Sequence, residues 1–193
     1  MQINESSIRL RNLIISLAIF VALALYAATY AEPVLRVSVM PGESPPVLRR
    51  KLKPLTDYLE KRVGMKMEFR PMLDDDALVD ALLSHKLDLV WIDGINLSRA
   101  RTRSNGRVIA LVQREEDENA RPGLIATSGH NGYTWTVRAD MDANLRQKMT
   151  EAFLSLNRNN SQGREILDLQ HARRFIPVRA EYHSVTQAPL AQP

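Results

Sequence analysis

The residues of this chain that are best suited to bind a small ligand lie in two short polar segments. The candidate ligand-binding residues are Glu43, Ser44, Trp91, Asp93 and Asn96. A serine hydroxyl can donate to an oxyanion, an indole ring can wall a pocket, and a carboxylate can accept from an amine or a protonated oxyanion. Each residue type also has a simpler explanation, because serine caps helices, tryptophan fills cores and Asp-Gly forms turns.

Enzymatic chemistry has less support in the sequence. The chain has no cysteine, which excludes disulfides, thiolate metal sites, a cysteine nucleophile and a lipid-bearing cysteine. Helix capping explains the consecutive acids Asp74 to Asp76, and the four histidines share no metal-ligand spacing. We therefore expect no metal and no cofactor. A periplasmic hydrolase assembled from Glu43, Ser44 and His130 is the enzymatic alternative, and we expect the chain not to be an enzyme.

The N-terminal segment has the pattern of an export signal. Leu13 to Ala31 is uncharged, Arg9 and Arg11 precede it, and Glu32 follows it. A basic flank, an apolar run and small residues at the end of the run are typical of a secretory signal, but an uncleaved run of this length can span a bilayer. We therefore predict a signal peptide or an N-terminal membrane anchor over 1–31. The rest of the chain is expected in the periplasm, anchored to the inner membrane if the segment stays uncleaved.

Composition places the remainder of the chain among globular proteins. The sequence has 193 residues, of which 45% are hydrophobic and 25% are charged, and its net charge is +4. This composition is ordinary for a globular protein and allows one or two domains. Because the basic residues are interspersed with acids, we expect no nucleic-acid partner.

Strand-like and helix-like segments alternate after residue 33, which is typical of an open parallel α/β sheet flanked by helices. The expected strands cover 34–40, 65–72, 87–92, 107–113, 133–138 and 175–178. Apolar spacings of three and four predict a helix that begins after Ser44 and ends at Gly64, with a kink or a new start at Pro54. In such sheets ligands bind at loops that leave the carboxyl ends of strands, and both polar segments fit that position.

Six segments, in order along the chain, resemble a known family. They are Val-Ser-Val-Met-Pro-Gly-Glu-Ser-Pro-Pro from Val37, Lys53 to Leu59, Ala81 to Trp91, Ala110 to Asp117, Tyr133 to Asp142, and Ala172 to Val178. Together they are similar to the phosphate, phosphite and phosphonate substrate-binding proteins of ABC transporters. The resemblance covers nearly all of Val34 to Val178.

This resemblance implies a periplasmic binding protein fold of type II, in which two lobes clamp an oxyanion and present it to a membrane permease. In that family the chain crosses into the second lobe after the segment that matches Val112 to Asp117, and it returns before Tyr133. Here only Glu118 to Gly132 lies between these points, whereas a whole lobe needs on the order of 100 residues. We therefore expect lobe I to be largely complete and lobe II to be missing.

The expected organisation follows from this comparison. The segments are a signal peptide or anchor over 1–31, the first part of lobe I over 32–117, a shortened crossover over 118–132, the returning part of lobe I over 133–178, and a polar tail over 179–193.

One motif inside the crossover is a secondary candidate for anion binding. The family carries a Ser-Thr-Ser-Gly-His turn at a helix N-terminus in its second lobe, and Thr127, Ser128 and His130 match the end of that turn. Asn131-Gly132 and a strand follow His130 where the motif should begin a helix. The sequence therefore favours a returning crossover for this segment.

We therefore predict an exported substrate-binding component of an ABC transporter for phosphonate, phosphite or phosphate, impaired by the loss of lobe II. Its partners would be a small oxyanion and a permease in the inner membrane. The alternatives are a ligand-incompetent or sensory binding module of the periplasm and, with less support, the hydrolase named above. Self-association is left open, because a second chain can supply the missing wall.

Overall fold

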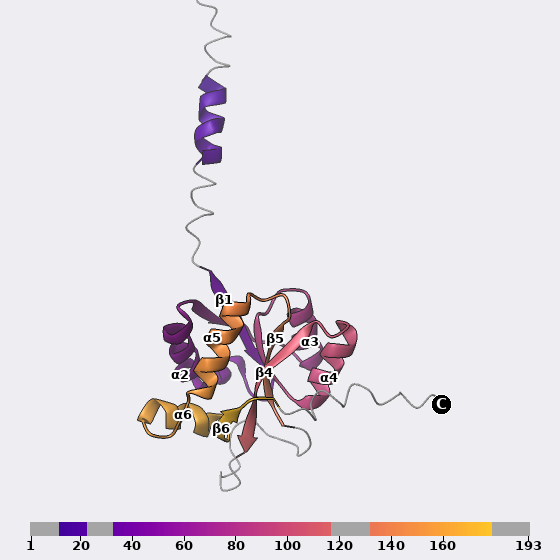
Figure 1. Ribbon diagram of the computed structural model, residues 1–193. Coiled ribbons are helices and arrows are strands. Elements are labelled where there is room, and N and C mark those ends of the chain that lie inside the picture. The colour runs from indigo at the N-terminus through magenta and orange to yellow at the C-terminus, as the bar shows by residue number, and fades with distance from the viewer. Residues whose placement is uncertain (1–11, 23–32, 117–131, 179–193) are drawn as a thin grey trace, which may run out of the picture. The chain divides into compact units, whose positions relative to one another are not determined.

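The chain consists of two compact units, Met1–Pro33 and Val34–Pro193. The computed structural model describes residues 12–22, 33–116 and 132–178 (Figure 1). In the first unit, residues 12–22 are helical. Within the described segments, no helix has both the length and the apolar character needed to cross a membrane.

Several sequence predictions fall on other parts of the chain. The predicted cleavage after Ala31, nearly all of the crossover and the polar tail lie outside the described residues.

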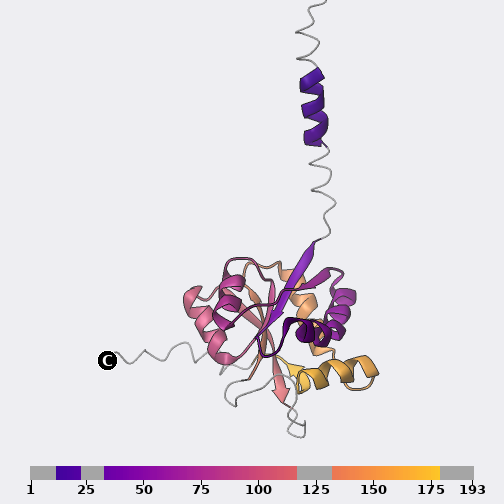
Figure 2. The same ribbon diagram turned by 180° about the vertical axis from the view of Figure 1, so that it is seen from behind.

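A six-stranded sheet forms the centre of the second unit (Figures 1 and 2). Its strands are β1 (Val34–Val39), β2 (Lys66–Phe69), β3 (Leu89–Ile92), β4 (Val108–Glu116), β5 (Thr134–Arg138) and β6 (Ala172–Ile176). They lie side by side in the order β2-β1-β3-β5-β4-β6. Strand β1 pairs in parallel with β2 and β3, whereas β5 is antiparallel to β3 and β4, and β6 is antiparallel to β4.

The prediction of an all-parallel sheet is therefore wrong. Strands β1 to β4 point in one direction, and β5 and β6 point in the other. The physical reason is that β5 lies directly beside β4, with Thr134 opposite Gln113. Neighbouring antiparallel strands need no crossover helix between them. The alternation of strands and helices elsewhere in the chain therefore does not fix the direction of β5.

Helices cover both faces of this sheet. They are α2 (Pro45–Val63), α3 (Asp75–Leu83), α4 (Gly94–Arg103), α5 (Ala143–Leu154) and α6 (Ser161–Leu169). Helix α2 contacts α5 and α6 on one face, and α3 contacts α4 on the other (Figures 1 and 2). Four helices have side-chain caps, because Asp74, Asp93, Asp142 and Asn160 each accept from the backbone N–H three residues further on.

Helix α2 begins and ends where the sequence predicts. Ser44 is its N-cap, and Gly64 follows its last turn with a φ of 78°, a left-handed value that glycine adopts without strain. Pro54 lies inside the helix without ending it, so the prediction of a new start there is wrong. Leu52 and Leu55, on either side of Pro54, are both buried, so the apolar face of the helix continues past the proline.

Apolar side chains fill the space between the sheet and the helices on each face. On the face covered by α2 and α5, the rings of Trp91 and Trp135 lie 5.1 Å apart, and those of Trp135 and Phe153 lie 5.3 Å apart. On the other face, Leu78 and Leu82 are fully buried in a second cluster. Fully burying one such side chain contributes about 1.5–3 kcal/mol. The second unit therefore has a core on both sides of one sheet.

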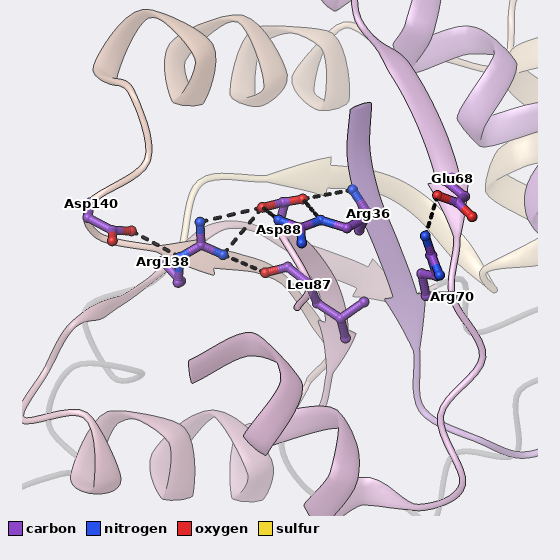
Figure 3. A network of polar contacts seen from close by, with 7 residues as sticks. All are labelled: Arg36, Glu68, Arg70, Leu87, Asp88, Arg138 and Asp140. Carbon is purple, nitrogen blue, oxygen red and sulfur yellow. Dashed lines mark hydrogen bonds and ion pairs between the residues drawn. The ribbon is translucent and has the colours of Figure 1, made fainter. Parts of the chain in front are cut away.

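A network of charged side chains closes the amino edge of the sheet, where β1 and β3 begin and β5 ends (Figure 3). Asp88 accepts from the backbone N–H and the guanidinium of Arg36, and it also pairs with Arg138. Arg138 donates to the carbonyl of Leu87 and to the carboxylate of Asp140. The network fastens β1, β3 and β5 together at the end of the sheet opposite the candidate ligand site.

Candidate functional site

The candidate site lies at the carboxyl edge of the sheet, where β1, β3 and β4 end and β5 begins. The two polar segments predicted to bind ligand follow β1 and β3, and the structure brings them together. The backbone N–H of Met40 donates to the carbonyl of Trp91 at 3.3 Å. The side-chain amide of Asn96 lies 3.9 Å from the sulfur of Met40. Loops at this edge of an α/β sheet are the usual position for a small-ligand site.

On the α2 side of the site, one of the two predicted residues is paired within the chain. Both carboxylate oxygens of Glu43 pair with the Nζ atom of Lys51, the longer contact being 2.6 Å. Ser44 is the N-cap of α2, but its hydroxyl makes no capping hydrogen bond.

The first turn of α2 is a poor source of backbone donors. Pro45 and Pro46 have no N–H group, and the N–H groups of Val47 and Leu48 both donate to the carbonyl of Ser44. The first turn of α2 therefore offers few free backbone N–H groups to an oxyanion.

On the α4 side of the site, acceptors predominate. Asp93 caps α4 by accepting from the N–H of Asn96 at 2.8 Å. Asn96 is 4% exposed, and its Nδ2 atom donates to Asp75 at 3.3 Å. Its Oδ1 atom has no hydrogen-bond partner in the described part of the chain. Two carboxylates and an amide oxygen suit a hydrogen-bond donor or a cation better than an oxyanion.

Trp91 belongs both to the core and to the edge of the site. It is 1% exposed, and its ring stacks on the ring of Tyr133 with centroids 5.5 Å apart. Its ring also meets the edge of Phe175 at 6.0 Å. Trp91 is therefore part of the core, and its ring packs against Tyr133 at the edge of the site.

Two residues of the site were missed by sequence reasoning, namely Arg114 and Tyr133. Arg114 is 4% exposed, and its guanidinium lies over the Tyr133 ring, 5.0 Å from the ring centroid. Its Nη1 atom donates to the carbonyl of Gln170 at 3.0 Å, and Nη2 pairs with Glu116. The signal that would have found Arg114 is its place near the carboxyl end of an expected strand.

Charged side chains from several elements shift the pKa of the Tyr133 hydroxyl. Burial, followed by the negative charges of Asp93 and Asp75, raises the pKa of the Tyr133 hydroxyl above its ordinary value, and the charge of Arg114 acts in the opposite direction. The hydroxyl therefore stays protonated at neutral pH. The charges of Asp93, Asp75 and Arg114 all act on it.

The secondary candidates Thr127, Ser128 and His130 lie outside the described residues. No group of three or more His, Asp or Glu side chains that could hold a metal ion is found among the described residues.

The mixed sheet, the helices on both of its faces and the loop site at its carboxyl edge define one α/β lobe of the kind found in periplasmic binding proteins. A family model described as "ABC transporter, phosphonate, periplasmic substrate-binding protein" matches residues 37–134. The chain belongs to this phosphonate-binding family of ABC transporter proteins. Members of the family are substrate-binding proteins and not enzymes.

Individual relatives agree with the family assignment. A probable ABC transporter phosphite-binding protein, PhnD1, from Prochlorococcus marinus (strain MIT 9301) is 24% identical over 92 residues. This match covers 48% of the present chain but only 31% of that relative.

Solved structures show the same fold. The structure of Prochlorococcus marinus PhnD1 in complex with methylphosphonate has a TM-score of 0.65 at 15% identity, over 79% of this chain and 95% of that one. A binding-protein component of an ABC phosphonate transporter from Pseudomonas aeruginosa has a TM-score of 0.67 at 8% identity, over 79% and 83%. The prediction of a periplasmic binding protein fold is confirmed.

Proposed function

We propose that this chain is an exported binding lobe for phosphonate-type oxyanions that works with an ABC permease and holds its ligand from one side only. The family assignment supports the ligand class, and so does one relative, PhnD1 of Prochlorococcus marinus, which is named for phosphite and whose structure holds methylphosphonate. The export pattern of the N-terminal segment supports a periplasmic location.

The proposal of a one-sided site rests on the positions of the end of β4 and the start of β5 in the sheet. Strands β4 and β5 are antiparallel neighbours, with Gln113 opposite Thr134. The described residues on either side of 117–131, Glu116 and Gly132, therefore both lie at the carboxyl edge of the sheet. Neighbouring strands lie about 4.8 Å apart, so a segment of this length joins them without a second lobe. A lobe of on the order of 100 residues does not fit in it.

An open half-site binds an oxyanion weakly. In a closed two-lobed site water is excluded, and a hydrogen bond to a charged group contributes about 1.5–3 kcal/mol. With one wall, the anion keeps much of its hydration, and the bonds that remain compete with water. We therefore expect a dissociation constant of about 1 mM or weaker, which corresponds to roughly −4 kcal/mol.

A second function is favoured by the acceptors at the site. Asp75 and Asp93 place negative charge at the carboxyl edge, and Pro45 and Pro46 remove backbone donors from the start of α2. These features support a periplasmic module that binds no oxyanion and serves sensing or contact with another protein.

Isothermal titration of the purified chain with phosphate, phosphite and methylphosphonate distinguishes these functions. Millimolar binding that is specific for the oxyanions supports the one-sided lobe. Micromolar binding by a monomer would contradict it, and micromolar binding by a dimer alone would show that a second chain supplies the missing wall. A complete lack of binding would favour the second function.

A further inference from the structure

The outermost strand β2 has a neighbouring strand on one side only within the described part of the chain. It begins the strand order of the sheet, and it pairs there with β1. A strand at the edge of a sheet presents N–H and C=O groups that can pair with a strand of another chain. Whatever occupies these groups therefore decides whether a second chain can add to the sheet.

The N–H group of Met67 lies on the outer side of β2. Along a strand, the backbone groups of successive residues point to alternate sides. The N–H of Arg70 donates to the carbonyl of Val37 in β1 at 2.9 Å, so the even-numbered residues of this segment direct their backbone groups toward β1. Met67 therefore directs its N–H and its carbonyl away from the sheet.

A side chain of α2 pairs with this outward N–H. The Oε1 atom of Glu60 accepts from the backbone N–H of Met67 at 2.8 Å. Glu60 is half-buried, and its carbonyl accepts from the N–H of Gly64, which closes the end of α2. A bond from an N–H group to a carboxylate is stronger than one between neutral groups. The Glu60 carboxylate thus occupies the position that the carbonyl of an added strand would take.

The other outermost strand, β6, also has a charged side chain on its backbone. The Nη2 atom of Arg158 donates to the carbonyl of Ala172 at 3.0 Å. An acidic side chain therefore binds an N–H on one outer strand, and a basic side chain binds a C=O on the other. Charged side chains at edge strands are a common protection against pairing with another chain.

The sequence of β2 is complementary to a second copy of itself. Lys66 and Glu68 lie on either side of Met67, are exposed and share one face of the strand. Glu68 pairs with Arg70 on that face (Figure 3). An antiparallel pair centred on the two Met67 residues would place Lys66 of each chain opposite Glu68 of the other, and opposite charges stabilise such cross-strand pairs. The partner that fits this edge is therefore a second copy of the chain.

We propose that Glu60 guards the outer edge of β2, and that a second copy adds there, β2 against β2, once the carboxylate no longer reaches Met67. The guard and the N–H that it occupies are only seven positions apart. Because both belong to one chain, their effective concentration is high, and the carboxylate outcompetes a second molecule. This inference concerns self-association and is independent of the proposed function.

Three substitutions of Glu60 separate its acceptor oxygen from its charge. Glu60→Gln keeps the length and an acceptor oxygen without the charge, whereas Glu60→Asp keeps the charge on a side chain that is too short by one methylene. Glu60→Ala removes both. Asp57→Ala is the matched control, because Asp57 is an acid of the same helix that pairs with Lys53.

The measurement is size-exclusion chromatography with light scattering on the full chain at several concentrations, alongside circular dichroism to confirm folding. We expect the wild type, Glu60→Gln and Asp57→Ala to be monomers. Glu60→Ala and Glu60→Asp should move toward the mass of a dimer as the concentration rises. Adding Lys66→Glu to Glu60→Ala puts like charges opposite each other in that dimer and should weaken it about tenfold.

Three results would overturn the proposal. One is a folded Glu60→Asp variant that stays monomeric, which decides the question even if Glu60→Ala fails to fold. Another is equal association by Asp57→Ala, which would show that loss of any acid from α2 has this effect. The third is a dimer that Lys66→Glu leaves unchanged, because its interface would then lie away from β2. None of these results depends on ligand binding, so the proposed function is tested separately.

Discussion

Asp88 and Arg36 are joined at three points, although they lie 52 positions apart in the chain. The Oδ2 atom of Asp88 accepts from the backbone N–H and from the Nε atom of Arg36, both at 2.8 Å, and Oδ1 accepts from Nη2 at 3.0 Å. The pair fastens the start of β3 to β1 (Figure 3). One carboxylate therefore holds together the central strands of the lobe.

Removal of this carboxylate charge is expected to be costly. Asp88→Asn should lower the free energy of unfolding by about 2–4 kcal/mol, because Arg36 and Arg138 both lose their shared counter-charge. Urea denaturation followed by circular dichroism measures the change. Asp140→Asn is the control, since Asp140 is 57% exposed and pairs with the same Arg138, and it should cost less than about 0.5 kcal/mol. Equal losses in the two variants would contradict the central role of Asp88.

The same carboxylate predicts a pH dependence of stability. Burial by itself raises the pKa of Asp88, but the hydrogen bonds and charge of Arg36, with the charge of Arg138, lower that pKa overall below its ordinary value of 3.8. The unfolded chain therefore binds this proton more readily than the folded one. The contribution of Asp88 to stability is complete above the ordinary value and is lost as the pH falls through the folded-state value. Asp88→Asn should therefore reduce the change in the free energy of unfolding between about pH 5 and about pH 2. Urea denaturation at each pH measures this free energy.

The two faces of the sheet should unfold together. Phe153→Ala, on the α5 side, is expected to cost about 3–5 kcal/mol, and Leu82→Ala, on the α3 side, about 2–5 kcal/mol, because both side chains are fully buried. Leu154→Ala, at a position that is 40% exposed, should cost much less. Each variant should show one cooperative thermal transition. A variant with two transitions would show that the faces fold independently and that the lobe is not one cooperative unit.

The sequence was sufficient to place the candidate loops but not to show what lies between them. Helix caps such as Asp74 and Asp93 are local signals, and the apolar run that ends at Ile92 marks a strand buried on both faces. These features are set by neighbouring residues, so they can be predicted from a single chain. They position both polar segments at the carboxyl edge of the sheet.

The rest of the site depends on pairing between distant segments. Arg114 and Tyr133 become neighbours only because β5 pairs antiparallel with β4, and nothing in the local pattern of either strand specifies that pairing. The contact between Asn96 and Asp75 has the same origin, since it joins the first turns of two helices 21 positions apart. Strand direction and the contacts of charged side chains are therefore the parts that sequence patterns alone could not supply.

Export should depend on the apolar N-terminal segment. Ile19→Arg places a charge near the middle of the uncharged run, which costs about 2.5–3.5 kcal/mol on insertion scales. We expect the variant to accumulate inside the cell, as measured by fractionation and immunoblotting. Ile19→Leu, which keeps the apolar character, should be exported normally. Normal periplasmic levels of the arginine variant would contradict the export function of this segment.

The charge of Asp93 should oppose oxyanion binding at the carboxyl edge. After burial, that charge is the largest cause that raises the pKa of Tyr133, so its field reaches the site. Asp93→Asn keeps a good N-cap for α4 and removes the charge. A charge about 8 Å away at an effective dielectric constant of about 40 contributes about 1 kcal/mol. Phosphate affinity should therefore rise about fivefold.

A comparison of two ligands shows what Asp93 does. Titration of Asp93→Asn with phosphate and with 2-aminoethylphosphonate measures the anionic and the ammonium-bearing ligand on the same protein. If Asp93 only repels the anion, both ligands should bind more tightly to the variant, whereas Asp140→Asn at the amino edge should bind both like the wild type. Tighter phosphate binding combined with weaker binding of the aminophosphonate would instead show that the carboxylate accepts from the ligand amine. Weaker binding of both would contradict the electrostatic prediction, because removal of a repelling charge cannot weaken an anion's binding.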